Sequence, residues 1–107
     1  MSLVKISDLS DAPEDASGKT IQLKHPYTKI EYDLAFFKAE GTYYVITDKC
    51  SKCGGSLGKG QLRGKFAICT TQECLWNIQK GYCKFDHSSV LPTYKVQAKE
   101  DGLYIEI

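Results

Sequence analysis

Two close pairs of cysteines constrain this chain more than any other feature, because a fold that joins them would place four thiolates around one centre. Two residues separate Cys50 from Cys53, and four separate Cys69 from Cys74. Cysteines grouped in this way usually hold a metal, since each pair can present two soft ligands from one backbone turn. The sequence therefore predicts a metal site formed by Cys50, Cys53, Cys69 and Cys74.

The composition is that of one globular domain, which we place over residues 1–107. A formal net charge of +1 gives no electrostatic footprint for nucleic acid or acidic membranes. No apolar run approaches the roughly 20 residues of a membrane helix, and the first eight residues lack the apolar core of a signal peptide. We therefore expect a cytoplasmic protein, in which cysteines favour metal or redox chemistry over structural disulfides. Lysine supplies all but one of the 14 basic residues, a bias that fits a thermophile.

Most of the chain alternates with a period of two, which is typical of strands. Residues 32–38 and 43–47 form one expected hairpin, and residues 93–99 and 103–107 form another. The other expected strands are short: 4–6, 20–23, 65–68 and 75–78, with 61–68 as a strand-like stretch between the cysteine pairs. No window sustains a helical stripe, so the sequence predicts an all-β fold, a small antiparallel barrel or sandwich.

The run from Tyr43 to Ile107 resembles a Rieske-type ferredoxin of the small, soluble, archaeal-like kind. The resemblance rests on a hairpin, a first loop, a strand into Cys69, a second loop and a closing hairpin. Its sequence motifs are Gly54-Gly55-Ser56-Leu57, Gly58 to Gly64, Trp76-Asn77-Ile78 with Gly81, and Leu91 to Val96. The resemblance implies a Rieske-like barrel or sandwich with a rubredoxin-like metal-binding subdomain, whose two loops lie at about 49–57 and 68–77.

In that family each loop supplies one cysteine and one histidine to a 2Fe-2S cluster. The resemblance places the family cysteines at Cys50 and Cys69, and the family histidines at Lys52 and Gln72. Neither lysine nor glutamine can replace imidazole, because one is a cation and the other offers a hard amide oxygen. Each loop carries an additional cysteine instead, so we expect the ligand set to have become all-thiolate.

Several centres fit four thiolates. A single iron or zinc needs sulfurs at about 2.3 Å, and the short cysteine side chain favours so compact a centre. An all-cysteine 2Fe-2S cluster is also chemically normal. The alternatives without redox function are an empty site, or a scaffold held together by zinc or by a disulfide. The pattern fits a natural paralogue and equally an engineered rubredoxin-like variant.

The favoured function is electron transfer through an iron centre, with a mononuclear site narrowly ahead of a cluster. The resemblance implies redox partner proteins, namely a reductase and a terminal oxygenase or similar acceptor. We expect a monomer without nucleic-acid or membrane partners. No catalytic motif is present, so an enzyme is not expected. Cys83 is expected to be a packed or free thiol, with a spare-ligand role left open for it and for His87.

Overall fold

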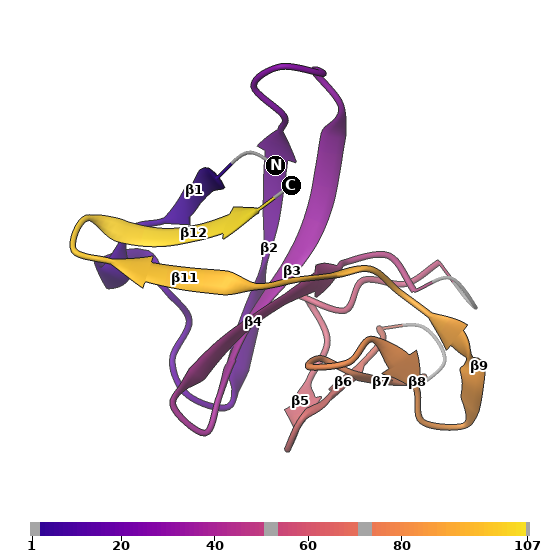
Figure 1. Cartoon of the computed structure of the whole chain (residues 1–107). Coiled ribbons are helices and arrows are strands. Elements are labelled where there is room, and N and C mark those ends of the chain that lie inside the picture. Colours follow the sequence, from indigo (N-terminus) through magenta and orange to yellow (C-terminus); the bar gives the residue numbers. More distant parts are fainter. Residues whose placement is uncertain (1–2, 51–53, 71–73, 107) are drawn as a thin grey trace.

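A computed structural model describes residues 3–50, 54–70 and 74–106 of the chain. Within these ranges the only helix is the 3-10 turn η1 (Leu9–Asp11), and every other regular element is an antiparallel β-strand (Figure 1). The strands are β1 (Leu3–Ser7), β2 (Ser17–Lys24), β3 (Glu31–Ala39), β4 (Thr42–Thr47), β5 (Leu62–Arg63), β6 (Phe66–Ile68), β7 (Leu75–Asn77), β8 (Tyr82–Cys83), β9 (Asp86–Val90), β10 (Thr93–Tyr94), β11 (Val96–Lys99) and β12 (Gly102–Glu106). The all-β fold class predicted from the sequence is confirmed.

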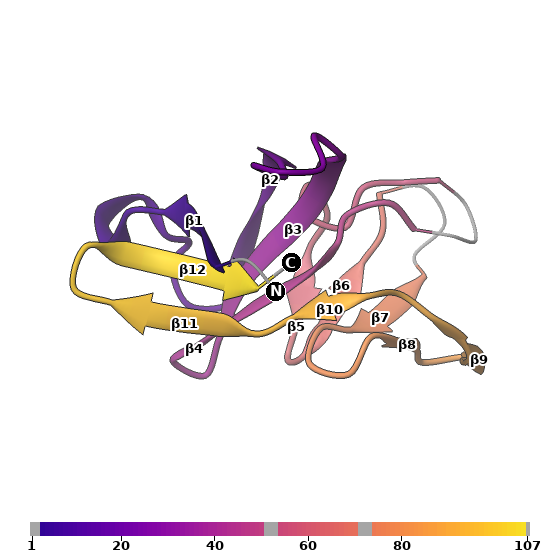
Figure 2. The same ribbon diagram turned by 45° about the horizontal axis from the view of Figure 1, so that its top comes forward.

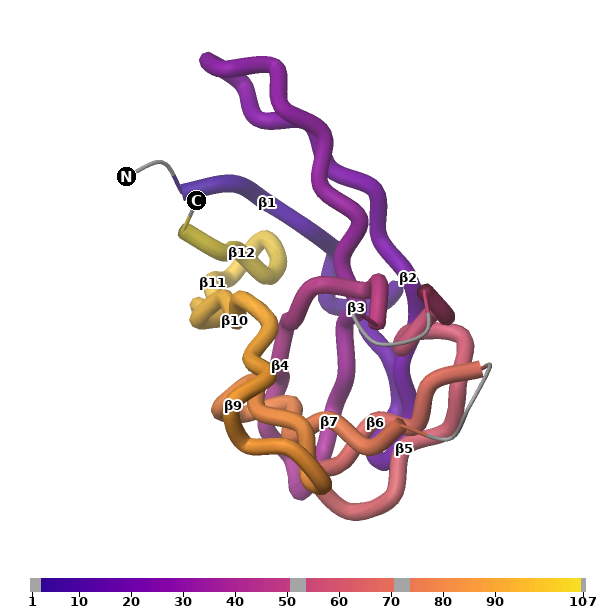
Figure 3. Tube along the Cα trace, turned by 90° about the vertical axis from the view of Figure 1, so that its right-hand side faces the viewer, coloured from indigo at the N-terminus to yellow at the C-terminus, as the bar shows by residue number. Residues whose placement is uncertain are grey.

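The strands form three sheets, in the orders β1-β12-β11, β10-β4-β3-β2 and β5-β6-β7-β8-β9. The first pairs the two ends of the chain, because Leu3 lies opposite Glu106 (Figures 1 and 3). The third contains only short strands and lies at the opposite side of the molecule from the β11–β12 turn (Figure 2). The cysteine loops connect to this third sheet.

β3 is buried on both faces and divides the core in two. Leu34 and Phe36 pack with Val45, Leu103 and Ile105 on the side of the β1-β12-β11 sheet. Ala35, Phe37 and Ala39 point the other way and pack with Trp76 and Cys83 of the β5–β9 sheet and with Ile78, which follows β7. Side chains alternate along a strand, so the unbroken apolar run 34–37 supplies both cores at once.

The first predicted hairpin is confirmed, with β3 paired to β4 from Leu34 opposite Thr47 to Ala39 opposite Thr42. Its two-residue turn has φ of 52° at Glu40 and 78° at Gly41. Two consecutive positive φ angles are those of a type I′ turn, whose twist matches that of the strands.

Three expectations about strands were incomplete. The stretch 61–68 is a tight hairpin of β5 and β6, because Gly64 takes a φ of 61° and reverses the chain. The stretch 93–99 is divided, because Thr93 and Tyr94 pair with β4 while residues 96–99 pair with β12. The strands β8 and β9 were not expected, since residues 86–89 are polar and carry no alternation.

The neighbours Phe36 and Phe37 allow the two cores to be perturbed separately. Replacing either by Leu should lower the free energy of unfolding by about 1–2 kcal/mol, because each side chain is fully buried. Phe37→Leu should reduce amide-exchange protection in β7 more than in β12, and Phe36→Leu should do the reverse. Identical exchange profiles for the two variants would contradict the division into two cores.

Candidate metal centre

Three cysteines meet at one end of the core that lies between β3 and the β5–β9 sheet. The ligand atoms of Cys50, Cys69 and Cys74 all lie within 4.8 Å of one another. Cys50 and Cys69 are buried and Cys74 is partly exposed. Cys53, the fourth predicted ligand, lies outside the described residues, and so do the two family histidine positions, Lys52 and Gln72. The structure thus brings together every predicted ligand that it describes.

The first loop holds Cys50 by hydrogen bonds that close around it. The Cys50 N–H donates to the Gly55 carbonyl and the Gly54 N–H donates to the Cys50 carbonyl, both at 2.8 Å. Gly54 has a φ of 76°, a conformation that side chains with a Cβ rarely adopt. The glycines after the first cysteine pair therefore allow the chain to curl back on the ligand.

Asp48 holds the first loop in place by hydrogen bonds. Its carboxylate accepts hydrogen bonds from the Ser56 hydroxyl, at 2.9 and 3.0 Å, and from the Gly58 N–H at 2.7 Å. Its carbonyl accepts from the Leu57 N–H at 2.8 Å. The Ser56 N–H in turn donates to the Thr70 hydroxyl at 3.1 Å and links the two loops directly.

The second loop begins where β6 ends. The Cys69 N–H donates to the Cys74 carbonyl at 3.0 Å, which brings the two ends of the loop together. Gly60 lies directly against the backbone of Ile68, the residue before Cys69. A Cβ at position 60 would come within 1.8 Å of the Ile68 carbonyl oxygen. Only glycine fits at position 60 without moving the strand that delivers Cys69.

Trp76 makes the most specific contact with a predicted ligand. Its indole N–H donates to Cys50 Sγ at 3.2 Å, and both residues are fully buried. This contact was not predicted from the sequence. The indole N–H of Trp76, two residues after Cys74, needs an acceptor once it is buried, but the sequence does not indicate which one.

The remaining candidates take structural places. Cys83 lies opposite Trp76 in the β7–β8 ladder as a buried free thiol, outside the cysteine group. The His87 ring contacts the Tyr82 ring at a tilt of 55°, with ring centroids 4.6 Å apart. His25 turns the chain between β2 and β3, and its Nδ1 accepts from the N–H groups of residues 27 and 28. Neither histidine belongs to a group of metal ligands in the described part of the chain.

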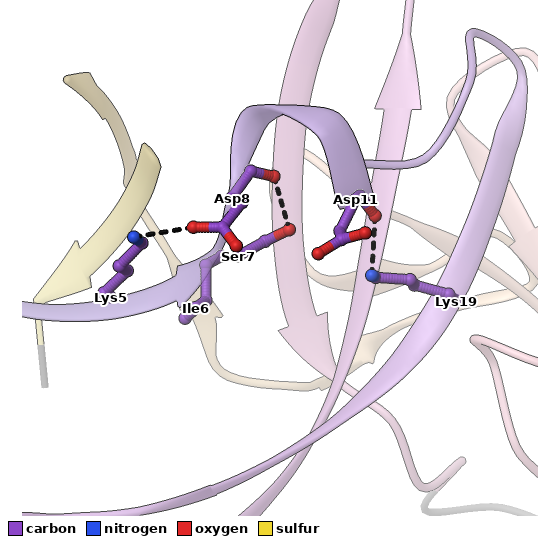
Figure 4. Close-up of a pocket in the computed structure, with 6 residues that line it drawn as sticks. All are labelled: Lys5, Ile6, Ser7, Asp8, Asp11 and Lys19. Atoms are coloured by element: carbon purple, nitrogen blue, oxygen red, sulfur yellow. Dashed lines mark hydrogen bonds and ion pairs between the residues drawn. The ribbon is translucent and has the colours of Figure 1, made fainter. Parts of the chain in front are cut away.

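A hollow near the N-terminus has no part in this centre. It is lined by Lys5, Ile6, Ser7, Asp8, Asp11 and Lys19 (Figure 4). Its charged groups engage one another, with Lys5 Nζ 2.7 Å from the Asp8 carboxylate and Lys19 Nζ donating to the Asp11 carbonyl at 2.7 Å. The Asp8 contact raises the pKa of Lys5, which stays protonated. The hollow is a solvated surface feature rather than a catalytic cleft.

Comparison with known proteins identifies the family. No family model matches the chain. The chain is 31% identical over 85 residues to the 3-phenylpropionate/cinnamic acid dioxygenase ferredoxin subunit of Photorhabdus laumondii, covering 74% of this chain and 79% of that protein. The chain belongs to the Rieske-type ferredoxins. This ferredoxin is accordingly an electron-transfer protein and not an enzyme.

Solved structures agree on the fold of this ferredoxin. The Sphingomonas yanoikuyae B1 ferredoxin superposes with a TM-score of 0.77, at 17% identity and 99% coverage of both chains. The ferredoxin of carbazole 1,9a-dioxygenase from Nocardioides aromaticivorans IC177 gives 0.76, at 12% identity, with 98% of this chain and 97% of that chain covered. In the described residues no helix is long and apolar enough to span a membrane.

The anchoring role of Asp48 is testable. Asp48→Asn leaves one side-chain oxygen where two accept hydrogen bonds, so we expect the free energy of unfolding to fall by about 1–3 kcal/mol. Asp33→Asn is the matched control, because it removes the same charge from an exposed strand position and keeps the Asp33 carbonyl that accepts from the Asp48 N–H. Denaturant unfolding measures both, and equal losses would refute the anchoring role.

Proposed function

We propose that this Rieske-type ferredoxin carries single electrons on an iron centre bound by Cys50, Cys53, Cys69 and Cys74, with one iron per chain. The observation that carries the proposal is the mutual proximity of the three described sulfurs, all within 4.8 Å. Cys53 enters as the fourth ligand from its spacing to Cys50 in the sequence.

The sulfur spacing favours one metal over two. Tetrahedral metal–sulfur bonds of about 2.3 Å place the sulfurs of one centre about 3.8 Å apart. In a two-iron cluster, two such tetrahedra share an edge of bridging sulfides, and cysteine sulfurs on different irons lie about 5.3 Å apart or more. Each iron accepts only two cysteines there, so three thiolates would include at least one long pair. The described separations fit the single centre.

The donor set does not fit the family's mixed centre. A Rieske cluster needs two imidazoles, and the chain's two histidines stand at positions 25 and 87. The described contacts place His25 in a turn and His87 on a tyrosine ring. Iron is preferred to zinc because the family function is electron transfer, and zinc has no redox chemistry. Anionic thiolates stabilise the oxidised metal, so we expect a lower reduction potential than with imidazole ligands.

Redox partners follow from the family. One structural neighbour is the complex of oxygenase and ferredoxin in carbazole 1,9a-dioxygenase, matched with a TM-score of 0.74 at 21% identity over 96% of this chain and 91% of that chain. We propose that this ferredoxin likewise receives electrons from a reductase and passes them to a terminal oxygenase or similar acceptor, acting as a monomer in the cytoplasm.

Metal and sulfide analysis with an optical spectrum tests the proposed centre. We expect one iron per chain, no acid-labile sulfide and thiolate-to-iron charge-transfer bands in the visible. A measured content of two irons and two labile sulfides per chain would contradict the mononuclear centre and indicate an all-cysteine cluster instead. A colourless protein holding zinc, or a metal-free protein with a disulfide, would overturn the redox proposal.

Cysteine variants test the ligand set. Replacing Cys50, Cys53, Cys69 or Cys74 by Ser should reduce metal content to well below one equivalent, because each change removes one of four thiolates. Cys83→Ser is the matched control, because Cys83 is a buried thiol outside the group, and it should keep full stoichiometry. Full metal content in the Cys53 or Cys74 variant would refute the four-thiolate model.

Trp76 offers a test that keeps all ligands. Trp76→Phe removes the hydrogen bond to Cys50 Sγ and retains an aromatic ring in the core. The N–H donor stabilises the more negative, reduced centre, so its loss should lower the reduction potential by about 40 mV, equivalent to about 1 kcal/mol for one electron. Voltammetry measures this shift, with Tyr44→Phe as a conservative control in the same core. An unchanged or raised potential would contradict the role given to Trp76.

A further inference from the structure

The charges of this ferredoxin are divided unevenly along the chain. Residues 48–92, which contain the cysteine loops and β5–β9, carry seven basic and three acidic residues. The remainder of the chain carries seven basic and ten acidic residues. The overall charge of +1 therefore combines +4 in residues 48–92 with −3 in the remainder of the chain.

Basic residues approach the cysteines from three separate elements. Lys49 directly precedes Cys50, and its Cε lies 3.9 Å from where a Cβ on Gly54 would be. Arg63, in β5, lines a surface groove that Cys69 also lines. The Lys84 N–H donates to the carbonyl of Leu75, the residue after Cys74, at 2.8 Å. Three basic residues thus adjoin the segments that carry the described ligands.

The described acidic groups within residues 48–92 are engaged locally. The Asp48 carboxylate accepts hydrogen bonds from Ser56 and Gly58 beneath the first loop. The Asp86 carboxylate accepts from the hydroxyls of Ser88 and Ser89 within its own turn. Both carboxylates are only partly exposed, whereas Lys49, Arg63 and Lys84 are exposed. Among the described residues of 48–92, every exposed charged side chain is therefore basic.

An exposed aromatic side chain accompanies the basic groups. Phe85, between β8 and β9, is 73% exposed, and Lys84 Nζ lies 5.9 Å from the centre of its ring. Protein interfaces combine an aromatic contact with a charged rim, and a largely exposed phenylalanine is otherwise unfavourable in water. The strand β9 after it lies on the same side of the molecule as β7 and β8 (Figures 1 and 2).

We propose that the cysteine end of this ferredoxin docks on an acidic surface of its electron-transfer partner, with Arg63 and Lys84 as the main charged contacts. This inference rests on the proposed redox function of the same end. Complementary charge raises the rate of productive encounter and makes that rate fall as salt is added. Docking here brings the partner to the groove lined by Arg63 and Cys69, where the path to a ligand is short.

Charged inorganic oxidants test the sign of the docking surface. In each reaction one electron leaves the reduced centre, and hexacyanoferrate(III) becomes hexacyanoferrate(II) or tris(phenanthroline)cobalt(III) becomes the cobalt(II) complex. We expect the stopped-flow rate constant with the anionic oxidant to fall with ionic strength and that with the cationic oxidant to rise. The opposite dependence would overturn the proposal.

Charge-reversal variants locate the surface. Arg63→Glu and Lys84→Glu should each slow oxidation by hexacyanoferrate(III) roughly fivefold at an ionic strength of about 0.1 M, for charges about one Debye length from the oxidant. Lys99→Glu makes the same change of charge at the far end of β11 and should leave the rate nearly unchanged. Equal effects of the three variants would refute a localised docking surface.

A redox-independent measurement separates this proposal from the proposed function. Hexacyanochromate(III) is an inert paramagnetic anion that broadens nearby amide resonances in nuclear magnetic resonance spectra. In the zinc-substituted protein it should broaden the amides of residues 49, 63 and 84 before those of 99–102. If the iron-loaded protein reacts with neither oxidant but this pattern holds, the redox function fails and the basic surface stands. Uniform broadening would refute the docking surface.

Discussion

The burial of β3 on both faces is the constraint on which the rest of this structure depends. Phe36 and Phe37 are adjacent and both fully buried, so the strand must be covered from each side. The β1-β12-β11 sheet covers one side and the short-stranded β5–β9 sheet covers the other. Cys50 and Cys69 are buried in the core between β3 and the β5–β9 sheet, so the geometry of the predicted ligands is coupled to the packing of that core.

Hydrogen bonds hold the two cysteine loops together, while the residues at the ligand positions differ from the family pattern. Hydrogen bonds through Asp48, Ser56 and Thr70 hold the loops together without using the side chains at the family histidine positions. The loops can therefore accept another donor set without losing these contacts. Cys74 stands close to Cys50 and Cys69, whereas the family pattern has two cysteines.

Much of the fold could be predicted because local sequence patterns indicate it. The first hairpin followed from its apolar strands and the Glu40-Gly41 turn, and three predicted ligands meet as expected. β8 and β9 could not be predicted, because their pairing comes from the sheet and not from alternation. The contact between Trp76 and Cys50 joins residues 26 positions apart, which no local pattern reveals. The role of Cys53, the archaeal-like or thermophilic source and the natural or engineered origin stay predictions.

The central claim is that four thiolates bind a single iron, and X-ray absorption at the iron edge of the purified ferredoxin tests it most directly. A mononuclear centre predicts a single shell of about four sulfurs at about 2.3 Å. Two edge-sharing tetrahedra would add an iron–iron distance of about 2.7 Å, and a Rieske-type donor set would add nitrogen neighbours. A spectrum with the sulfur shell alone is the predicted result, and an iron–iron or nitrogen shell would contradict it.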